Sequence, residues 1–231
     1  MAGMLKTIGF KIPQSCLLCQ QPADALICHY CQTDLPVLAL SQCDYNLLNW
    51  PKIKSGLQQV AYDSLLVSTE YCWPWDKLLT ALKFNQRTLC AKALAEQFYR
   101  IALTHNGKRP EVILPMPLHY KRYAKRKYNQ TMEIAKHLSA LSGIALDDQL
   151  CQRSKATQAQ TQLSGAQRRK NLRDAFRLSS SPAYQHVAIF DDIIATGSTV
   201  NSLSKALKKA KPSLHIEVWA IAISLSPGTS N

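Results

Sequence analysis

Short runs of apolar residues alternate along most of the chain with longer segments in which apolar residues recur at helical spacing. The runs are typical of buried strands and the longer segments of amphipathic helices. Strands are predicted at 59–68, 111–114, 144–150, 186–190 and 214–224. Helices are predicted at 76–102 with an interruption around 84–87, and at 128–141, 164–171 and 198–210. This alternation predicts an α/β fold with a mostly parallel sheet and helices on both faces.

The first 45 residues lack helical periodicity and hold five of the eight cysteines. We therefore expect a small cysteine-organised module at 1–45. Residues 46–57, which include Pro51 and Gly56, are predicted to form a linker. The larger α/β domain is expected over 58–226, because 231 residues are enough for one such domain and a small appended module.

Four cysteines form two closely spaced C-x2-C pairs, Cys16–Cys19 and Cys28–Cys31. Each pair places two thiolates on one turn, and two such pairs complete a tetrahedral Zn²⁺ site without an open position. The motif therefore predicts a structural zinc in a zinc-ribbon-like module. Cysteines without a partner at this spacing are Cys43, Cys72, Cys90 and Cys151.

We searched the sequence for a signal peptide and for a segment long enough to span a membrane, because both bear on the compartment of the protein. No signal peptide is recognisable, because Lys6 and Lys11 interrupt the first dozen residues. The longest apolar run, 218–225, is too short to cross a bilayer, so no membrane insertion is expected. We expect a cytoplasmic location, where cysteines serve as metal ligands or buried thiols and do not form a disulfide framework.

The chain is strongly basic, with a formal net charge of +13. Such a charge favours anionic partners, for example phosphorylated ligands or nucleic acid. Two long stretches, 112–132 and 149–173, contain no acidic residue. Either stretch alone is equally consistent with a solvated basic loop. Because the two basic stretches occur together with a phosphate-binding motif, however, they favour an anion site.

That motif follows the predicted strand at 186–190, which leads into Asp191 and Asp192 and then into the hydroxyl-rich run ATGST at 195–199. Adjacent carboxylates at the end of a buried strand repel each other, so they need a partner such as a sugar diol or a metal-bearing ligand. The run lies at a predicted helix start, whose N–H groups and dipole favour phosphate. Gly197 would let the backbone approach the ligand. A simple helix cap is the alternative, although a cap needs only one of these residues.

Residues 187–199 resemble the phosphoribosyl pyrophosphate signature of type I phosphoribosyltransferases over its whole length. The resemblance implies a type I phosphoribosyltransferase-like fold. It implies that Asp191 and Asp192 bind the ribose hydroxyls and that Mg²⁺ accompanies the ligand. The residues implied in holding the 5′-phosphate are Ala195, Thr196, Gly197, Ser198 and Thr199.

The cysteine module and this domain together resemble the ComF family of competence-associated proteins, which includes the GntX-like members, over nearly the whole chain. The segment PMPLH at 115–119, followed by basic residues and YNQ at 128–130, is similar to a second family motif. Lys127-Tyr128 stands where Gly-Phe is common in the family. Residues 153–176 follow a third family pattern, R…T-x-x-Q…L-S…R…N…F.

In type I phosphoribosyltransferases, the loop at the place of 115–119 contacts pyrophosphate, and a mobile loop resembling 152–169 closes over the site. Basic side chains there neutralise the leaving group, and a lid keeps water from an oxocarbenium-like ribose. For 128–130, a helix start with an Asn cap is an equally good interpretation. The pyrophosphate and lid candidates are Pro117, His119, Lys121, Arg122, Arg153, Lys155 and Arg168.

Three functions remain open. The first is a ComF-like role in natural transformation and DNA uptake, with single-stranded DNA as a partner and a helicase-like protein suggested by the family context. The second is an active phosphoribosyltransferase with an unknown acceptor, and the third is a non-catalytic ligand sensor. A glutamine-hydrolysing amidotransferase is not expected, because residue 2 is alanine and not the cysteine nucleophile. DNA contacts are predicted where charges and rings interleave, at Arg122, Tyr123, Lys125, Arg126 and Lys127.

Overall fold

The computed structural model describes residues 14–57, 60–85, 87–104, 107, 109–118, 123–124, 127–153 and 175–224. By its internal contacts the chain divides into two compact units, Met1–Leu35 and Pro36–Asn231. The predicted helix at 164–171 and residues 154–169 of the predicted lid-like loop lie outside the described residues. So do seven candidate site residues, which are His119, Lys121, Arg122, Lys125, Arg126, Lys155 and Arg168.

The first unit contains little regular structure. Strand β1 (Gln14–Ser15) pairs antiparallel with β2 (Pro22–Ala23), and one short helix follows, α1 (His29–Thr33). Its described core is small and includes Cys16, Leu26 and Ile27. A unit with so few buried apolar groups needs another source of stability, such as a bound metal ion.

The second unit opens with short helices, η1 (Leu40–Cys43), η2 (Leu47–Asn49) and α2 (Pro51–Gly56). The prediction of a linker at 46–57 is wrong, because these residues are packed: Leu47 is fully buried. Pro51 occupies the first position of α2, where its missing N–H group is not needed. Asn46 Oδ1 accepts from Leu48 N at 3.1 Å and from Leu65 N at 3.0 Å, which ties the segment to the sheet.

The central sheet has five strands in the order β3 (Ser64–Glu70), β9 (His215–Ile223), β8 (His186–Ile194), β4 (Val112–Pro115) and β5 (Ala145–Leu146). All neighbouring pairs are parallel, which confirms the predicted sheet type. Three strands depart from their predicted bounds: β3 begins five residues later than the predicted 59, β8 runs four residues further than expected, and only 145–146 are extended within 144–150. A separate antiparallel pair, β6 (Cys151–Arg153) with β7 (Phe176–Leu178), was not predicted.

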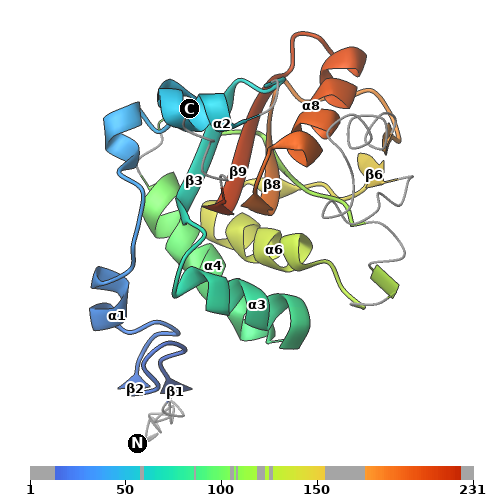
Figure 1. Ribbon diagram of the computed structural model, residues 1–231. Helices are drawn as coiled ribbons and strands as arrows, with labels where there is room; N and C mark the ends of the chain where they lie inside the picture. The colour runs from blue at the N-terminus through green and yellow to red at the C-terminus, as the bar shows by residue number, and fades with distance from the viewer. Residues whose placement is uncertain are drawn as a thin grey trace, which may run out of the picture. The chain divides into compact units, whose positions relative to one another are not determined.

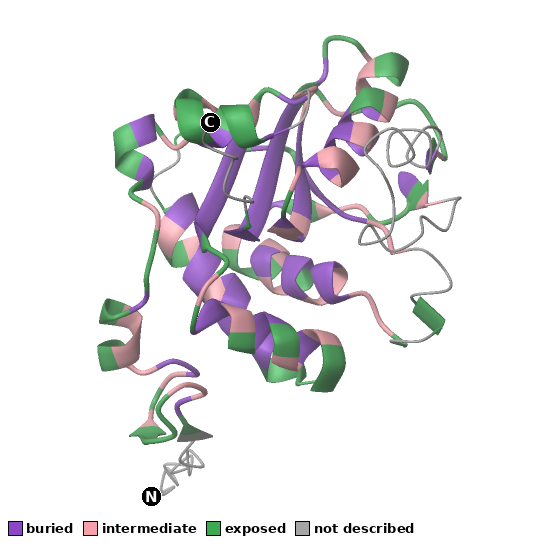
Figure 2. Ribbon diagram, viewed as in Figure 1, coloured by how far each residue is buried: buried purple, intermediate pink, exposed green. Residues whose placement is uncertain are grey.

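Helices cover both faces of the sheet. Helices α3 (Trp75–Asn85), α4 (Thr88–Phe98) and α6 (Gln130–Ser142) lie on one side, and α8 (Ser198–Ala210) on the other (Figure 1). A π-helical turn, η3 (Tyr99–Leu103), continues α4. Because α3 ends at Asn85 and α4 begins at Thr88, the predicted break around 84–87 is confirmed. The helices predicted at 128–141 and 198–210 are also confirmed. Strand β9 is buried at every position after its first, as expected between two helical layers (Figure 2).

The topology of the sheet singles out one place along its edge. From β4 the chain passes through α6 to β5 at the outside of the sheet, whereas from β8 it passes through α8 to β9 in the opposite direction. The direction of winding therefore reverses between the neighbours β4 and β8. Open α/β sheets bind ligands at such a reversal, beyond the carboxyl ends of the strands. The ends of β4 and β8 are thus the expected ligand site.

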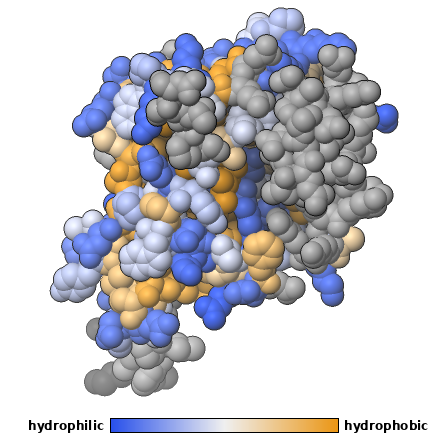
Figure 3. Space-filling view, in the orientation of Figure 1, coloured by the Kyte–Doolittle hydropathy of each residue, from blue (hydrophilic) through white to orange (hydrophobic). Residues whose placement is uncertain are grey.

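The surface mixes polar and apolar side chains. In the face shown in Figure 3, apolar side chains reach the surface in patches between polar ones. Trp73 and Phe84, near the two ends of α3, are 68% and 67% exposed. Within the described residues, no helix combines the length and apolar character required to span a bilayer.

Candidate functional site

The segment after β8 has the geometry of an anion-binding turn. β8 ends at Ile194, and α8 begins at Ser198. Gly197 between them has φ +68°, a conformation that glycine adopts without strain, and a Cβ there would lie 3.1 Å from Leu57 Cδ2. Because the cap residue is glycine, no side chain of its own occupies the first N–H groups of α8. These groups and the positive end of the helix dipole favour an anion.

A pocket beside this turn brings most of the predicted ligand residues together. It is lined by Asp191, Ile193, Ile194, Ala195, Thr196, Gly197, Ser198, Thr199 and Val200. Thr196 Oγ1 donates to Ser198 Oγ at 3.0 Å, so hydroxyl groups line the pocket beside the N–H groups. One carboxylate, three hydroxyl-bearing residues and a helix start therefore line the same small pocket.

The sequence suggested that the two carboxylates follow β8. They lie inside it instead, because β8 pairs with β9 as far as Ile194. Successive strand residues point to opposite faces, so Asp191 and Asp192 have different surroundings. Burial, together with repulsion from Asp192, raises the pKa of Asp191 to about 8. Asp191 is thus held as an acid that prefers its protonated form near neutral pH.

Asp192 is 6% exposed and is neutralised by a residue that the sequence analysis missed. Lys83 Nζ, from the last turn of α3, lies 2.7 Å from Asp192 Oδ2. The same oxygen accepts from Gln130 Nε2, at the first residue of α6, at 3.3 Å. A signal for Lys83 was present in the sequence, because Lys83 continues the four-residue spacing of the buried Trp75 and Leu79. A lysine on the apolar face of a helix indicates a buried partner.

Gln130 also presents an unsatisfied acceptor at this place. Its side chain is buried, and Gln130 Oε1 has no hydrogen-bond donor among the described residues. A buried acceptor without a partner costs about 1–3 kcal/mol. A hydroxyl-bearing ligand beside Asp192 would supply the missing donor.

The end of β4 forms the other half of the site. Met116 N donates to Phe190 O at 2.8 Å, which places 115–117 directly beside the carboxyl end of β8. Met116 O accepts from Asn129 Nδ2 at 3.1 Å and from Thr131 Oγ1 at 2.9 Å. Asn129 Oδ1 accepts from Thr131 N at 3.2 Å, which confirms that Asn129 caps α6. Asn129 therefore shapes the loop of Pro117 through the backbone.

A hollow of about 590 Å³ adjoins this loop. Its size is typical of sites for small molecules. Its lining includes Pro117, Tyr123, Tyr128, Lys136 and Arg153. Tyr123 is 52% exposed, and the Arg153 guanidinium lies 5.6 Å from the centre of the Phe176 ring. Glu133 and Asp148 also line the hollow, and Lys136 Nζ lies 2.8 Å from Glu133 Oε1, so the lining carries both signs of charge. The aromatic rings suit a flat partner.

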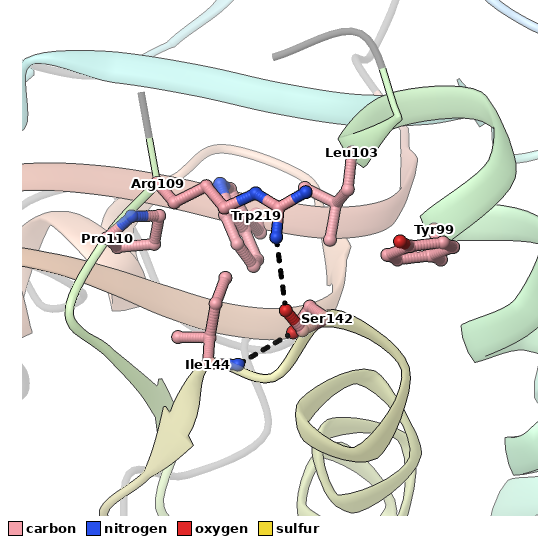
Figure 4. Close-up of a pocket in the computed structure, with 7 residues that line it drawn as sticks. All are labelled: Tyr99, Leu103, Arg109, Pro110, Ser142, Ile144 and Trp219. Atoms are coloured by element: carbon pink, nitrogen blue, oxygen red, sulfur yellow. Dashed lines mark hydrogen bonds between the residues drawn. The ribbon is translucent and has the colours of Figure 1, made fainter. Parts of the chain in front are cut away.

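A second, smaller hollow lies elsewhere in the unit and is mostly apolar (Figure 4). It is lined by Tyr99, Leu103, Arg109, Pro110, Ser142, Ile144 and Trp219. Arg109 Nη1 donates to Ser142 O at 3.3 Å across its rim. This hydrogen bond joins the segment between η3 and β4 to the last residue of α6.

In the first unit, the four paired cysteines converge. Cys19 Sγ and Cys28 Sγ are 3.7 Å apart, and the sulfur atoms of all four lie within 4.8 Å of one another. Sulfur atoms bound to one tetrahedral zinc at about 2.3 Å would be about 3.8 Å apart, so the spacing fits a structural metal. Cys43 belongs to the other unit, where Cys43 Sγ donates to Leu40 O at 3.2 Å as a buried thiol.

Electrostatics in this cluster also favour a cation. Burial opposes ionisation of Cys16, but N–H groups, first that of Cys28, lower its pKa to about 6. Cys28 N and Leu18 N lie 3.4 Å and 3.5 Å from Cys16 Sγ. Burial and hydrogen bonds to the neighbouring thiols raise the pKa of Cys31 to about 12. The cluster thus offers a first thiolate at neutral pH but cannot ionise fully without a compensating positive charge.

The described residues thus define an α/β protein with a parallel sheet covered on both faces, a turn at the reversal of winding whose geometry suits an anion, and a unit in which four cysteine sulfur atoms converge. No protein-family model matches the chain. It is 35% identical over 172 residues to competence protein F of Haemophilus influenzae, an alignment that covers 71% of this chain and 75% of that protein.

Longer alignments extend this similarity to both units. The chain is 31% identical over 226 residues to DNA utilization protein YhgH of Salmonella typhimurium, covering 93% of this chain and 99% of the relative. It is 28% identical over the same length to YhgH of Escherichia coli strain K12. The chain belongs to the ComF family of competence proteins, as the sequence motifs predicted.

Proposed function

We propose that this chain acts in the uptake or utilisation of DNA in the cytoplasm and binds phosphoribosyl pyrophosphate at the carboxyl end of β8. The role in DNA metabolism follows from the family, whose relatives are named competence protein F and DNA utilization protein. The proposal of this ligand depends on one observation: Asp191 and the first residues of α8 line the same pocket. A helicase-like protein is the proposed protein partner.

The chemistry of the ligand matches the groups present. The 5′-phosphate would bind the N–H groups and hydroxyls of 195–199 at the positive end of α8. The ribose hydroxyls would donate to Asp191, Asp192 and the unsatisfied Gln130 Oε1. Mg²⁺ is usually held by one or two carboxylates together with phosphate oxygens, so these two aspartates suit an ion that arrives with pyrophosphate. Such an ion would neutralise charge on the ligand.

Lys83 sets the charge balance of this site. In the structure described here, Lys83 neutralises Asp192 at 2.7 Å. Pyrophosphate adjacent to Asp192 would attract the same ammonium group, so Lys83 would be shared between the ligand and the aspartate. We therefore expect Lys83→Met to weaken ligand binding at least tenfold.

Calorimetric titration of phosphoribosyl pyrophosphate with Mg²⁺ into the full chain tests this proposal. We expect the double change Asp191→Asn and Asp192→Asn to weaken binding at least 100-fold, because Mg²⁺ would displace the proton of Asp191 and bind the carboxylates, and amides cannot replace them in this role. Asp44→Asn is the matched control, since Asp44 is exposed and its left-handed backbone tolerates asparagine. Absence of binding to the wild type, or equal binding to the double variant, would refute the site.

The proposed DNA surface surrounds the hollow beside Pro117. Exposed Tyr123 lines the hollow together with Arg153, exposed Lys127 directly precedes the lining residue Tyr128, and the chain as a whole carries a net charge of +13. Single strands bind where bases stack on rings and phosphates meet cations. Affinity for a labelled oligonucleotide should fall steeply with salt, and Tyr123→Ala should weaken binding about tenfold. Salt-independent or absent binding would contradict the proposal, and Tyr71→Ala, an exposed ring elsewhere, is the control.

An active phosphoribosyltransferase is the second candidate, favoured by the hollow that adjoins the β4 end and has room for an acceptor. In that case, incubation with phosphoribosyl pyrophosphate and candidate bases or amines would release pyrophosphate, and Asp191→Asn would abolish the release. Tight binding without turnover would instead identify a ligand sensor.

Zinc is the proposed metal of the cysteine unit, since four thiolates at tetrahedral spacing favour it. We expect one tightly bound zinc per chain by elemental analysis. Cys28→Ser should lose the metal, and Cys72→Ser, a change in the other unit, should retain it. A chain that folds its first unit without metal would contradict this role.

A further inference from the structure

A second cluster of metal-ligating side chains lies at the amino end of the sheet, away from the proposed ligand site. His186 begins β8 and His215 begins β9, and the two are register partners. Glu217 follows two residues later on the same strand as His215 and therefore on the same face. His186 and Asp191 are separated by five residues of extended strand, about 17 Å. The cluster is consequently distinct from the phosphate pocket.

The three side chains approach one another closely. His186 Nε2 lies 3.0 Å from Glu217 Oε1, and the ring centres of His186 and His215 are 4.6 Å apart. One possible ligand atom from each residue lies within 4.8 Å of the others. A hydrogen-bonded pair would account for His186 and Glu217 alone. It does not account for the second imidazole placed beside them.

Two of these side chains are also oriented by other residues. Trp219 Nε1 donates to Glu217 Oε2 at 2.8 Å, which leaves Glu217 Oε1 directed toward the histidines. His215 Nδ1 lies 3.6 Å from Asp63 Oδ2, so His215 Nε2 is left for another partner. Asp63 itself accepts from Ile216 N at 2.8 Å and lies 2.9 Å from Lys208 Nζ. Metal-binding histidines and carboxylates are commonly held by such outer partners.

We infer that His186, His215 and Glu217 bind a divalent transition-metal ion of the zinc class. Two imidazoles and one carboxylate suit zinc, cobalt or nickel better than magnesium or calcium, which prefer oxygen ligands. The side chains of His186 and Glu217 are only 16% and 8% exposed, whereas that of His215 is 50% exposed. An ion can therefore approach from the side of His215 and would complete its coordination with water. It would join the first residues of β8 and β9.

The experiment uses the full chain with its cysteine unit already loaded with zinc, titrated with Co²⁺ and followed by absorption and calorimetry. We expect a second ion per chain, bound without the sulfur-to-metal charge-transfer absorption that cysteine ligands produce. His215→Ala and Glu217→Gln should each weaken this ion at least tenfold. Neither change is expected to unfold the chain, since His215 is half exposed and glutamine preserves an acceptor for Trp219.

His137→Ala, a histidine change on α6 outside the cluster, is the matched control and should leave the second ion in place. Cys28→Ser should remove the sulfur-bound ion and retain the other. The inference is overturned if no second ion binds to the wild type, or if that ion persists in both His215→Ala and Glu217→Gln. It does not depend on the proposed ligand, because phosphoribosyl pyrophosphate binding is expected to be unchanged in His215→Ala.

Discussion

Burial and the adjacent Asp192 raise the pKa of Asp191 at the carboxyl end of β8, whereas hydrogen bonds lower the pKa of Asp63 at the other end of the sheet. Burial also opposes ionisation of Asp63, but Ile216 N and Lys208 outweigh it. At the carboxyl end, moreover, Gln130 Oε1 lacks a donor within the described residues. The two ends of one sheet thus differ in how fully their polar groups are satisfied. Groups left unsatisfied reduce stability and are retained where a ligand completes them.

The largest expected difference between the two ends of the sheet is in the loss of stability when the lysine at each end, Lys83 or Lys208, is replaced. Lys83→Met leaves the carboxylate of Asp192 buried and unpaired, so we expect a loss of about 3 kcal/mol in the free energy of unfolding. Lys208→Met should cost less than about 1 kcal/mol, because Lys208 and Asp63 are both partly exposed. Denaturant titration measures both changes.

Adding Asp192→Asn to Lys83→Met should recover most of the loss, because the amide leaves no buried charge. Equal costs for the two lysine changes would show that the Asp192 pair is no more important to stability than the surface pair. The comparison between the two ends would then fail.

The next largest effect is expected at the turn before α8. Gly197→Ala should cost about 2 kcal/mol, because it combines a left-handed backbone with a 3.1 Å approach to Leu57. Gly143→Ala has a similar φ of +73° but open space around the new methyl group, so we expect about 1 kcal/mol. If thermal unfolding gave the same loss for both, the close packing at Gly197 would have no energetic consequence.

A smaller effect is expected from Asp191→Asn, and it depends on pH. The folded pKa of Asp191, about 8, lies above its ordinary value of 3.8, so the wild type loses stability as pH rises from about 4 to about 8. Asparagine imitates the protonated acid and avoids this loss. The variant should match the wild type at pH 4 and become progressively more stable than the wild type as the pH rises to 8.5. A constant difference across this range would contradict the raised pKa.

Asp63→Asn should show the opposite dependence and the smallest effect. Because the folded pKa of Asp63 is lowered, its stabilising contribution is present above its ordinary value of 3.8 and is lost as pH falls through the folded value. We expect Asp63→Asn to cost about 0.5 kcal/mol at pH 7, since this carboxylate is 36% exposed, and almost nothing at pH 2.5. Urea titrations at both pH values provide the measurement.

Local patterns in the sequence predicted much of the fold. Helix α8 was expected from its apolar spacing, and the break between α3 and α4 from the interruption of that spacing around 84–87. The cysteine spacing predicted the convergence of four thiols, since each pair is formed within one turn. The extension of β8 through Asp191 and Asp192 was missed because carboxylates disfavour strands. Pairing with β9 overrides that preference.

Contacts between distant segments could not be read from the sequence. Lys83 and Gln130 lie 109 and 62 residues from Asp192, and only packing of α3 and α6 on the sheet brings them together. Likewise, β6 and β7 are three-residue strands, too short to show a period. The turn between β8 and α8 was therefore predictable as a motif. The side chains that balance its charge required the structure.

The meeting of α3, α6 and β8 at Asp192 has a consequence for how the molecule would report an event in the pocket. Each helix contributes one end to this carboxylate, Lys83 from the last turn of α3 and Gln130 from the first turn of α6. A molecule that competes with Asp192 for Lys83 or Gln130 would change how often the last turn of α3 and the first turn of α6 unfold locally. Amide hydrogen exchange in these two turns should therefore respond to occupancy of a site formed mainly by residues 191–199, far away in the sequence.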